Sequence, residues 1–429
     1  MVSRTEGGNR LLLRRIRSNH NAWNMLLMEP LFGIVYNLFN PFLYVYMSQL
    51  GCSEVQIGLL TTVGLLCQFV FSIVAAPITD RLGRRWTTLI FDLLSWSLAV
   101  LLWMVAHNFW VFLVAAVLQA INRIVVVSWT CLMVEDTEKD LLVTLFSWIT
   151  VAGLLSGFFS PAAAVFVQAN LIVAMRWLLG AAFVVFTGMF ILRHILTKET
   201  SVGRVRMAQS RQESLPGQLR ELSRTAVEIW RAPKLRFLFL LTAVYNMALT
   251  VRGSFISLLL TETLGFGAAS IGFYSLATSA VMLAVYFLVI PHIQARPPKR
   301  PLTWGLALCA AGFLLLAPVW PGRVLEVVSL VLSVVLTSVG TAVAQPFIDG
   351  LGHASIDNDK RANMTAILSS LILLATAPFG WLGGLLFKLD GRLPFVASAV
   401  FYVLAAVLMA WRYHHSVGES TTTAVETTD

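Results

Sequence analysis

Charged residues are scarce in this sequence of 429 residues. They make up 12% of the chain, whereas hydrophobic residues make up 57%. Soluble domains carry about 25% charged residues. Together with a mean hydropathy of +0.77, this composition excludes a water-soluble globular enzyme.

Several chemical signatures are also missing. The four cysteines stand singly, so neither a disulfide framework nor a zinc site is predicted. No phosphate-binding loop of the form G-x-x-x-x-G-K-S/T occurs, so ATP is not expected to supply energy. No cluster of His and Cys suits a metal ion, and no cofactor is expected. Segment 1–20 is basic but lacks the apolar core and the cleavage site of a signal peptide.

Long apolar runs fill most of the chain. Runs such as 89–106, 109–134 and 237–260 carry almost no charge and reach the ~18 residues that mark a membrane-spanning helix. Only helices or closed barrels can span lipid, and the alternating pattern of a barrel strand is absent. The sequence therefore predicts an all-α integral membrane protein. Windows of ~20 residues give twelve transmembrane helices, at 22–49, 56–78, 87–106, 109–134, 141–166, 177–196, 236–262, 269–292, 302–318, 325–350, 363–387 and 394–411.

Lysine and arginine are unevenly distributed over the loops between these spans. If both termini are cytoplasmic, 25 of the 31 lie in inside segments and four in outside loops. The positive-inside rule therefore predicts N- and C-termini in the cytoplasm. The net charge of +9 then reflects topology and contact with anionic membrane lipids, and not binding of nucleic acid. Short loops and more Arg than Lys favour the cell membrane of a prokaryote.

The chain also repeats itself at an offset of 214 residues, half its length. Three short matches carry the repeat: Leu50-Gly51 with Leu264-Gly265, Ile57-Gly58 with Ile271-Gly272, and Pro77 with Pro291. The repeat predicts two pseudo-symmetric six-helix halves, 1–196 and 236–429. They are joined by a cytoplasmic linker, 197–235, in which apolar residues at helical spacing over 212–230 predict an amphipathic helix.

The loop after the second predicted span carries a ten-residue motif. It reads Ala76-Pro-Ile-Thr-Asp80-Arg81-Leu-Gly83-Arg84-Arg85. This resembles motif A of the major facilitator superfamily, G-x-x-x-D-R-x-G-R-R, with Ala76 in place of the first glycine. The resemblance covers the whole chain, because the spans, the two halves, the central linker and the inside termini agree with it as well. It implies the fold of this superfamily, a monomer, and transport by alternating access.

The motif residues are expected to form a gate. Gly83 permits a tight turn. Asp80 would meet the positive end of the helix that begins near residue 362, next to Lys360 and Arg361. Arg81, Arg84 and Arg85 would face acids after the fourth span, namely Glu135, Asp136, Glu138 and Asp140. By analogy with the family, these contacts would hold the cytoplasmic side closed; the alternative is a merely solvated basic turn.

Four ionisable residues lie well inside predicted spans: Glu29, Asp92, Arg123 and Arg252. Each is costly in lipid unless it is paired or hydrated, so each is a candidate functional residue. Asp92 lies close to the cytoplasmic face and is interpreted as structural. The resemblance implies that the first, fourth, seventh and tenth helices surround a central cavity, and the other three residues lie on that set.

Polar residues on these four helices complete the candidate substrate and coupling site. The set is Glu29, Tyr36, Asn37, Asn40, Gln119, Arg123, Tyr245, Asn246, Arg252 and Gln345. The polar stripe on 325–350 is more typical of helix packing than of binding.

Glu29 and Arg123 differ in depth by roughly 6 Å at ~1.5 Å per residue, which predicts an ion pair between them. Glu29 would then act as a protonation switch, unless the pair is a fixed structural contact. Arg252 would be left for an anionic or zwitterionic group of the substrate.

These observations favour a secondary active transporter that moves a small organic solute and is coupled to protons. The alternatives are a lipid flippase or a multidrug efflux protein on the same scaffold and, less favoured, an integral-membrane transferase. Uptake and efflux both stay open. The expected partners are the solute, protons and membrane lipids.

Overall fold

The structure is a computed structural model that describes residues 15–17, 19–209, 224–225, 227–294, 296–318, 322–355 and 361–416. Within these ranges every regular element is a helix and no strand occurs. The all-α prediction is therefore confirmed for the described part of the chain.

Eleven helical segments of the described chain are long and apolar enough to cross a membrane. They are His20–Gln49, Glu54–Leu82, Arg84–Val105, Phe109–Val134, Lys139–Val167, Leu171–Leu196, Pro233–Thr263, Ala269–Leu288, Arg323–Gly352, Met364–Leu389 and Leu393–Trp411. Each coincides with a predicted span to within six residues at either end. The remaining predicted span, 302–318, coincides with α17 (Lys299–Leu314), which has only 16 residues. The count of twelve and the cytoplasmic termini thus stay predictions.

The chain divides into two compact units. Unit 1 falls within Met1–Gly51 and Cys67–Gly217, and unit 2 within Cys52–Leu66 and Gln218–Asp429. Helix α4 (Glu54–Leu82) is shared, because its first part packs with unit 2. The predicted halves 1–196 and 236–429 stay a prediction of domain organisation. The amphipathic helix predicted at 212–230 lies largely outside the described residues.

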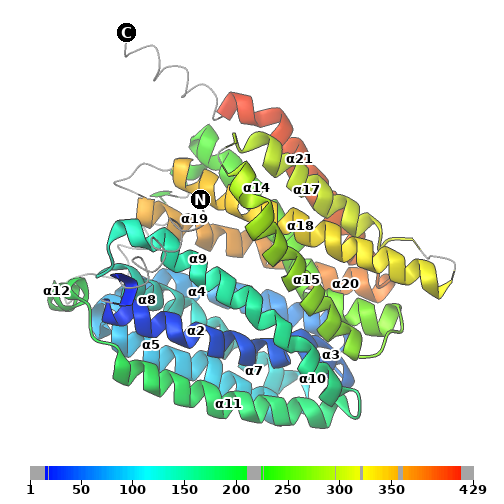
Figure 1. The fold of residues 1–429 in the computed structure, drawn as a ribbon, viewed down its shortest axis with the longest axis horizontal. Coiled ribbons are helices and arrows are strands. Elements are labelled where there is room, and N and C mark those ends of the chain that lie inside the picture. The colour runs from blue at the N-terminus through cyan, green and yellow to red at the C-terminus, as the bar shows by residue number, and fades with distance from the viewer. Residues whose placement is uncertain are drawn as a thin grey trace, which may run out of the picture. The chain divides into compact units, whose positions relative to one another are not determined.

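Unit 1 contains α2 (His20–Phe39), η1 (Asn40–Phe42), α3 (Leu43–Gln49), the rest of α4, α5 (Arg84–Asp92), η2 (Leu93–Leu98), α6 (Ala99–Val105), α7 (Phe109–Ala120), α8 (Asn122–Val134), α9 (Lys139–Ser156), η3 (Gly157–Phe159), α10 (Ser160–Val167), α11 (Leu171–Leu196) and α12 (Ser201–Gln209). Helix α11 packs against α2 and α6, α2 also packs against α9, and α5 packs against α8 (Figure 1). An aromatic cluster fills the space between α2, η2 and α11; its members are Phe32, Tyr36, Phe39, Trp96 and Phe186.

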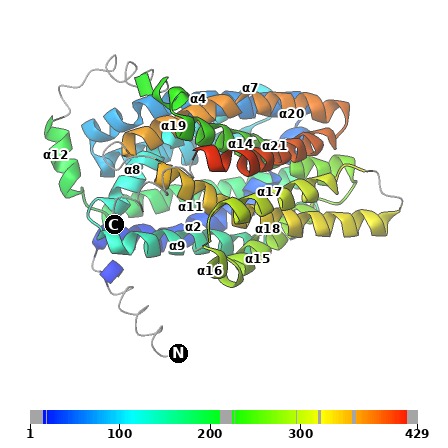
Figure 2. The same cartoon turned by 90° about the horizontal axis from the view of Figure 1, so that it is seen from above.

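Unit 2 contains the first part of α4, α14 (Pro233–Leu258), η5 (Leu259–Thr263), α15 (Ala269–Leu288), α16 (Ile290–Ile293), α17, α18 (Arg323–Ser355), α19 (Arg361–Thr376), α20 (Pro378–Leu389) and α21 (Leu393–Ser416). Helix α14 packs against α19, α20 and α21 (Figure 2). Helices α17 and α18 approach at backbone distance, because a Cβ atom on Gly340 would lie 2.5 Å from the Gly305 carbonyl oxygen. The polar stripe on α18 faces this contact, with Thr337 against Gly312, as the packing interpretation expects.

Several spans are broken where the helical hydrogen-bond pattern is interrupted. Pro41, Pro161 and Pro378 each stand at the start of a new helical segment, since proline lacks the N–H that would continue the preceding helix. The fourth span breaks at Ile121 without a proline, between α7 and α8. A break changes the direction of the side chains after it, and Arg123 is the second residue beyond this one.

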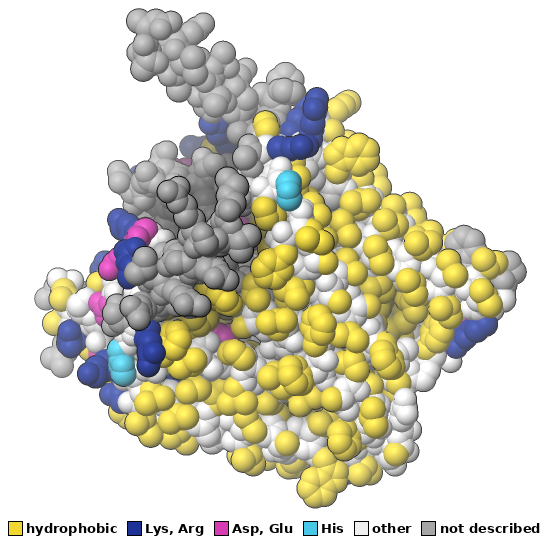
Figure 3. Space-filling view, viewed as in Figure 1, with side chains coloured by type: hydrophobic (Ala, Val, Ile, Leu, Met, Phe, Trp, Pro, Cys, Tyr) yellow, Lys and Arg dark blue, Asp and Glu magenta, His cyan; other side chains and the backbone are white. Residues whose placement is uncertain are grey.

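The matched turns of the sequence repeat share one backbone conformation. Gly51 and Gly265 have φ angles of 88° and 62°, in the left-handed region that side chains with a Cβ atom disfavour. The same local constraint therefore explains the same residue in both halves of the sequence. Large apolar side chains cover most of the face drawn in Figure 3, as expected of helices whose solvent is lipid.

Candidate transport site

The motif residues of unit 1 form a charged cluster around Arg84. Gly83 has a φ of 83° and precedes α5, so Arg84 is the first residue of that helix. Its guanidinium pairs with Asp80 at 2.7 Å (Nη1 to Oδ1) and with Glu135 at 3.0 Å (Nη2 to Oε1). Arg84 is only 4% exposed, so these two carboxylates are what compensates its charge.

Glu199 completes this cluster, although no motif or pattern in the sequence singles it out. The backbone N–H groups of Arg84 and Arg85 donate to its two carboxylate oxygens at 3.1 and 3.0 Å. A carboxylate at the first turn of α5 is favourable because the free N–H groups and the helix dipole are positive there. Gly83 is needed for this contact, since a Cβ atom there would lie 2.6 Å from the Glu199 carboxylate.

The other acids after α8 have different partners from those predicted. Glu138 and Asp140 both pair with Arg15, and Asp136 accepts a hydrogen bond of 2.6 Å from the Ser201 hydroxyl. The prediction that the motif arginines face all four acids is therefore corrected: Arg84 pairs with Glu135, while Arg85 donates to the His194 carbonyl at 2.8 Å. The Ser201 contact forms because the chain that follows α11 passes the end of α8, next to Asp136.

The predicted contact of Asp80 with the start of α19 stays a prediction. Lys360 lies outside the described residues, and of Arg361 only the backbone position at the start of α19 is described.

The predicted pair of Glu29 and Arg123 is wrong. Glu29 lies in α2, close enough to the Trp129 indole of α8 and to Arg193 of α11 to interact with both. Trp129 is six residues beyond Arg123 on α8, a displacement of about 9 Å at ~1.5 Å per residue. Within the described chain no ion pair joins Glu29 to Arg123. The prediction failed because it rested on depth alone, whereas the Glu29 side chain is directed toward Arg193 of α11.

Arg193 is the arginine that sequence reasoning missed. It forms a buried ion pair with Asp92 of α5; the two side chains are 7% and 3% exposed. Its guanidinium also lies 5.1 Å from the centre of the Phe190 ring. Asp92 and Arg193 both lie inside predicted spans, so the sequence could have indicated this pair. Arg193 was instead counted with the basic residues at the edge of the cytoplasmic linker. This buried pair agrees with the structural interpretation of Asp92, which stays a prediction.

The remaining polar residues of unit 1 do not converge on one point. Asn37 donates 2.8 Å to the Gly33 carbonyl of its own helix, and Tyr36 packs in the aromatic cluster, with its ring 5.7 Å from that of Trp96. Asn40 begins η1, and Gln119 lies one residue before the end of α7. Among the described residues, no hydrogen bond or ion pair joins any of these four to Arg123.

Unit 2 brings together a second polar group around Arg252. The Arg252 guanidinium of α14 lies 3.4 Å from the Thr341 hydroxyl of α18, and Tyr274 of α15 is close enough to interact with it electrostatically. Tyr402 of α21 and Tyr245 of α14 are also in electrostatic contact with it. Five side chains from four helices thus lie close together inside this unit.

Hydrogen-bond donors outnumber acceptors among these five side chains around Arg252. In the described part of the chain no carboxylate lies within ion-pair distance of Arg252. Tyr245 and Tyr402 are 1% and 0% exposed, and neither hydroxyl has a hydrogen-bond partner. Guanidinium has five N–H donors and no acceptor, so the cluster can accommodate an acceptor-rich anionic group.

The other two predicted residues of unit 2 bond elsewhere. Asn246 donates 2.8 Å to the Thr242 carbonyl of its own helix. Gln345 donates to both carboxylate oxygens of Asp349, at 3.0 and 3.1 Å. Within the described residues no group of three or more His, Cys, Asp and Glu side chains could hold a metal ion.

Comparison with known proteins now identifies the family. Over residues 25–346 and 238–427 the sequence matches the family model described as Major Facilitator Superfamily. The chain belongs to this superfamily of membrane transporters, and it is a multi-pass membrane protein. No curated protein matches the sequence.

Solved structures resemble the chain in fold. A POT family transporter in complex with a thioalcohol-conjugated peptide has a TM-score of 0.67 at 13% identity, over 92% of this chain and 96% of that one. The nucleoside transporter NupG has a TM-score of 0.65 at 15% identity, over 92% and 100%. The human organic anion transporter MFSD10 has a TM-score of 0.56 at 14% identity, over 92% and 99%. At such identities the likeness concerns the fold alone.

Proposed function

We propose that this chain is a secondary active transporter of the cell membrane that moves a small organic solute with an anionic group, by alternating access. Arg252 is the residue that binds this group, and Glu29 couples transport to protons. Membership of the superfamily supports solute transport in general. The choice of substrate class rests on one observation: Arg252 lies in the core of unit 2 with hydroxyl partners and no described carboxylate partner.

The charge of Arg252 supports an anionic ligand on energetic grounds. An ionised group away from water is costly unless another charge compensates it. The Thr341 hydroxyl accepts a hydrogen bond from the guanidinium and the Tyr274 hydroxyl lies nearby, but neither carries a charge. A carboxylate or phosphate would supply the charge and would match the planar guanidinium with two parallel hydrogen bonds. The free hydroxyl groups of Tyr245 and Tyr402 add donors close by.

The coupling role of Glu29 is supported by its shared partner. Arg193 already pairs with Asp92, so Glu29 is the second acid that acts on one guanidinium. Protonation of Glu29 removes one negative charge from this group without breaking the Asp92 pair. A proton can therefore bind and leave at low cost to the fold, which is what a coupling residue requires.

A ligand-induced thermal-shift screen of the purified protein tests the proposal. The panel contains organic carboxylates, phosphate esters, neutral sugars, lipophilic cations and phospholipids. A ligand that binds only the folded state stabilises it by about 2.7 kcal/mol at a hundredfold excess over Kd. We expect shifts with carboxylates or phosphate esters, and loss of these shifts in Arg252→Gln.

The matched control is Arg206→Gln, which removes an exposed arginine on α12 and should keep every shift. Shifts with lipophilic cations or lipids alone would contradict the proposal, and would instead favour multidrug efflux or lipid flipping on the same fold.

A further inference from the structure

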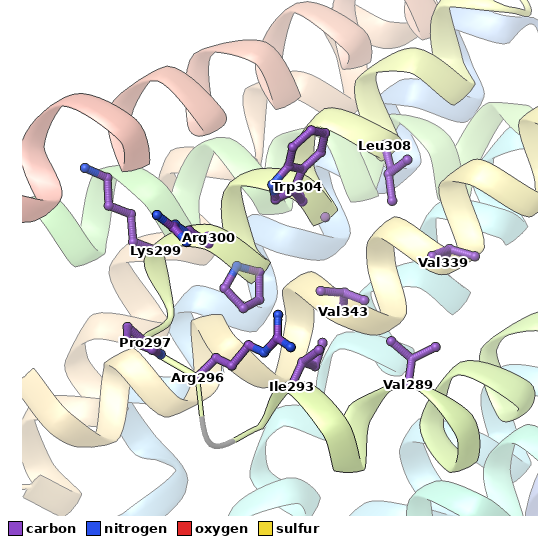
Figure 4. A pocket seen from close by; sticks show the side chains of 12 residues that line it. Val289, Ile293, Arg296, Pro297, Lys299, Arg300, Trp304, Leu308, Val339 and Val343 are labelled. Atoms are coloured by element: carbon purple, nitrogen blue, oxygen red, sulfur yellow. The ribbon is translucent and has the colours of Figure 1, made fainter.

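Unit 2 contains a cavity of about 1020 Å³ bounded by α16, α17 and α18 (Figure 4). Apolar side chains form its walls: Val289, Ile293, Trp304, Leu308, Val339 and Val343. Three basic residues, Arg296, Lys299 and Arg300, gather at one end, whereas Leu308 and Val339 lie at the other (Figure 4). We refer to this cavity as the basic groove.

The packing of three helices produces the basic groove. Gly305 and Gly340 bring α17 and α18 into backbone contact, and Val285 of α15 packs against Ala342 and Val343 of α18. Helix α18 therefore forms the floor, with α17 on one side and the α15–α16 segment on the other. The walls are fixed by helix contacts, so the groove does not depend on a bound ligand to form.

No acid among the described residues compensates the charges at the basic end. In the part of the chain that the structure describes, no carboxylate lies within ion-pair distance of Arg296, Lys299 or Arg300. The Arg296 side chain points into the groove, while the Lys299 amine points away from it (Figure 4). Trp304, on the apolar wall, is 71% exposed. The groove thus presents positive charge next to exposed apolar surface.

We propose that the basic groove binds one anionic phospholipid of the surrounding membrane. The lipid phosphate lies at Arg296 and Arg300, and an acyl chain extends along Trp304, Leu308 and Val339. The volume is at the upper end of the ~300–1,000 Å³ that small-molecule sites occupy. Arginine suits a phosphate because its planar group donates two parallel hydrogen bonds. The distribution of Lys and Arg predicts that this loop is cytoplasmic, where anionic lipids concentrate.

Native mass spectrometry of the full-length protein, released from detergent after titration with phosphatidylglycerol, tests the proposal. Phosphatidylcholine, which has the same acyl chains and no net charge, serves as the comparison lipid. We expect one phosphatidylglycerol adduct that forms at lower concentration than the phosphatidylcholine adduct. Arg296→Gln/Arg300→Gln should weaken it roughly fivefold per arginine. Arg231→Gln, which removes an exposed arginine outside the groove, should leave the affinity unchanged.

A second variant tests the apolar part of the groove without a change of charge. Val339→Trp fills the apolar end and should displace phosphatidylglycerol while Arg296 and Arg300 stay in place. Equal binding of both lipids, or retention of the adduct in both variants, would overturn the proposal. Displacement of the lipid by inorganic phosphate or glycerol 3-phosphate at similar concentrations would also overturn it, because the site would then recognise a free anion. Thermal unfolding in lipid-free detergent confirms that each variant is folded.

Discussion

Two arginines inside apolar spans have opposite surroundings in the two units. Arg193 in unit 1 pairs with Asp92 and is in electrostatic contact with Glu29. Arg252 in unit 2 meets the hydroxyl groups of Thr341 and Tyr274, and no described carboxylate pairs with it. Burial alone therefore does not tell what a charged residue does. Under the proposed function, Arg193 joins helices through its acid partners, whereas Arg252 keeps its charge for the solute.

The largest expected effect is on stability in unit 1. Arg193→Gln leaves the Asp92 carboxylate buried without its partner, and breaking such a pair costs about 3–5 kcal/mol. Thermal unfolding in detergent should show a large decrease in melting temperature, while Arg206→Gln should show none. The double variant Asp92→Leu/Arg193→Met removes both charges and should regain much of the loss. A melting temperature of Arg193→Gln equal to that of the wild type would contradict the structural role.

The next effect concerns ligand binding in unit 2. Arg252→Gln removes a cation without leaving an acid unpaired, so the ligand-free protein should unfold at or above the wild-type temperature. The stabilisation by an anionic solute, about 2.7 kcal/mol at a hundredfold excess over Kd, should disappear. Arg252→Lys keeps the charge and should retain part of it. A destabilisation as large as that of Arg193→Gln would show that Arg252 has an unrecognised structural partner.

The loss of stability on substitution of Arg84 should lie between those expected for Arg193→Gln and Arg252→Gln. It bonds two carboxylates near the surface, so Arg84→Gln should cost about 1.5–3 kcal/mol, the range for hydrogen bonds to charged groups. Arg85 next to it donates to a neutral carbonyl, and Arg85→Gln should cost only about 0.5–1.5 kcal/mol. Urea or thermal unfolding of both variants gives the comparison. Equal losses would mean that the Asp80 and Glu135 charges contribute nothing beyond a neutral hydrogen bond.

Only a small change in stability is expected for Glu29→Gln. The glutamine keeps a polar side chain beside the Trp129 indole, and Asp92 still pairs with Arg193, so the loss should stay within about 1 kcal/mol. Proton movement should nevertheless be lost. A pH-sensitive dye inside proteoliposomes reports it when an anionic solute from the thermal-shift screen is added. Asn37→Ala, on the same helix, should keep proton movement; unchanged proton movement in Glu29→Gln would exclude it from coupling.

The fold was largely predictable because hydropathy and charge distribution are properties of whole segments. Apolar runs of about 20 residues leave few alternatives in lipid, and the matched segments all became helices. The interruptions within the helical spans were harder to predict from the sequence. Proline marks those at Pro41 and Pro378, but the break at Ile121 has no such residue. Helix α17, with only 16 residues, also shows that composition predicts the presence of a helix more reliably than it predicts the length of that helix.

The site was predictable in residue type but not in pairing. Glu29, Asp92 and Arg252 stood out because a charge in an apolar run is rare. Which side chains meet depends on helix rotation and on breaks, and neither can be read from one sequence. For this reason Glu29 was matched to Arg123 when its neighbours are Arg193 and Trp129. Glu199 was missed because a single acid in a polar linker has no distinguishing pattern.

The most direct test compares Arg193→Gln and Arg252→Gln side by side, each with and without the anionic solute that shifts the wild type most. The account predicts that Arg193→Gln melts at a lower temperature yet keeps its solute-induced shift. It predicts that Arg252→Gln keeps its ligand-free melting temperature and loses the shift. If Arg252→Gln instead shows the full shift, Arg252 does not bind the solute, and the proposed distinction between the two arginines is wrong.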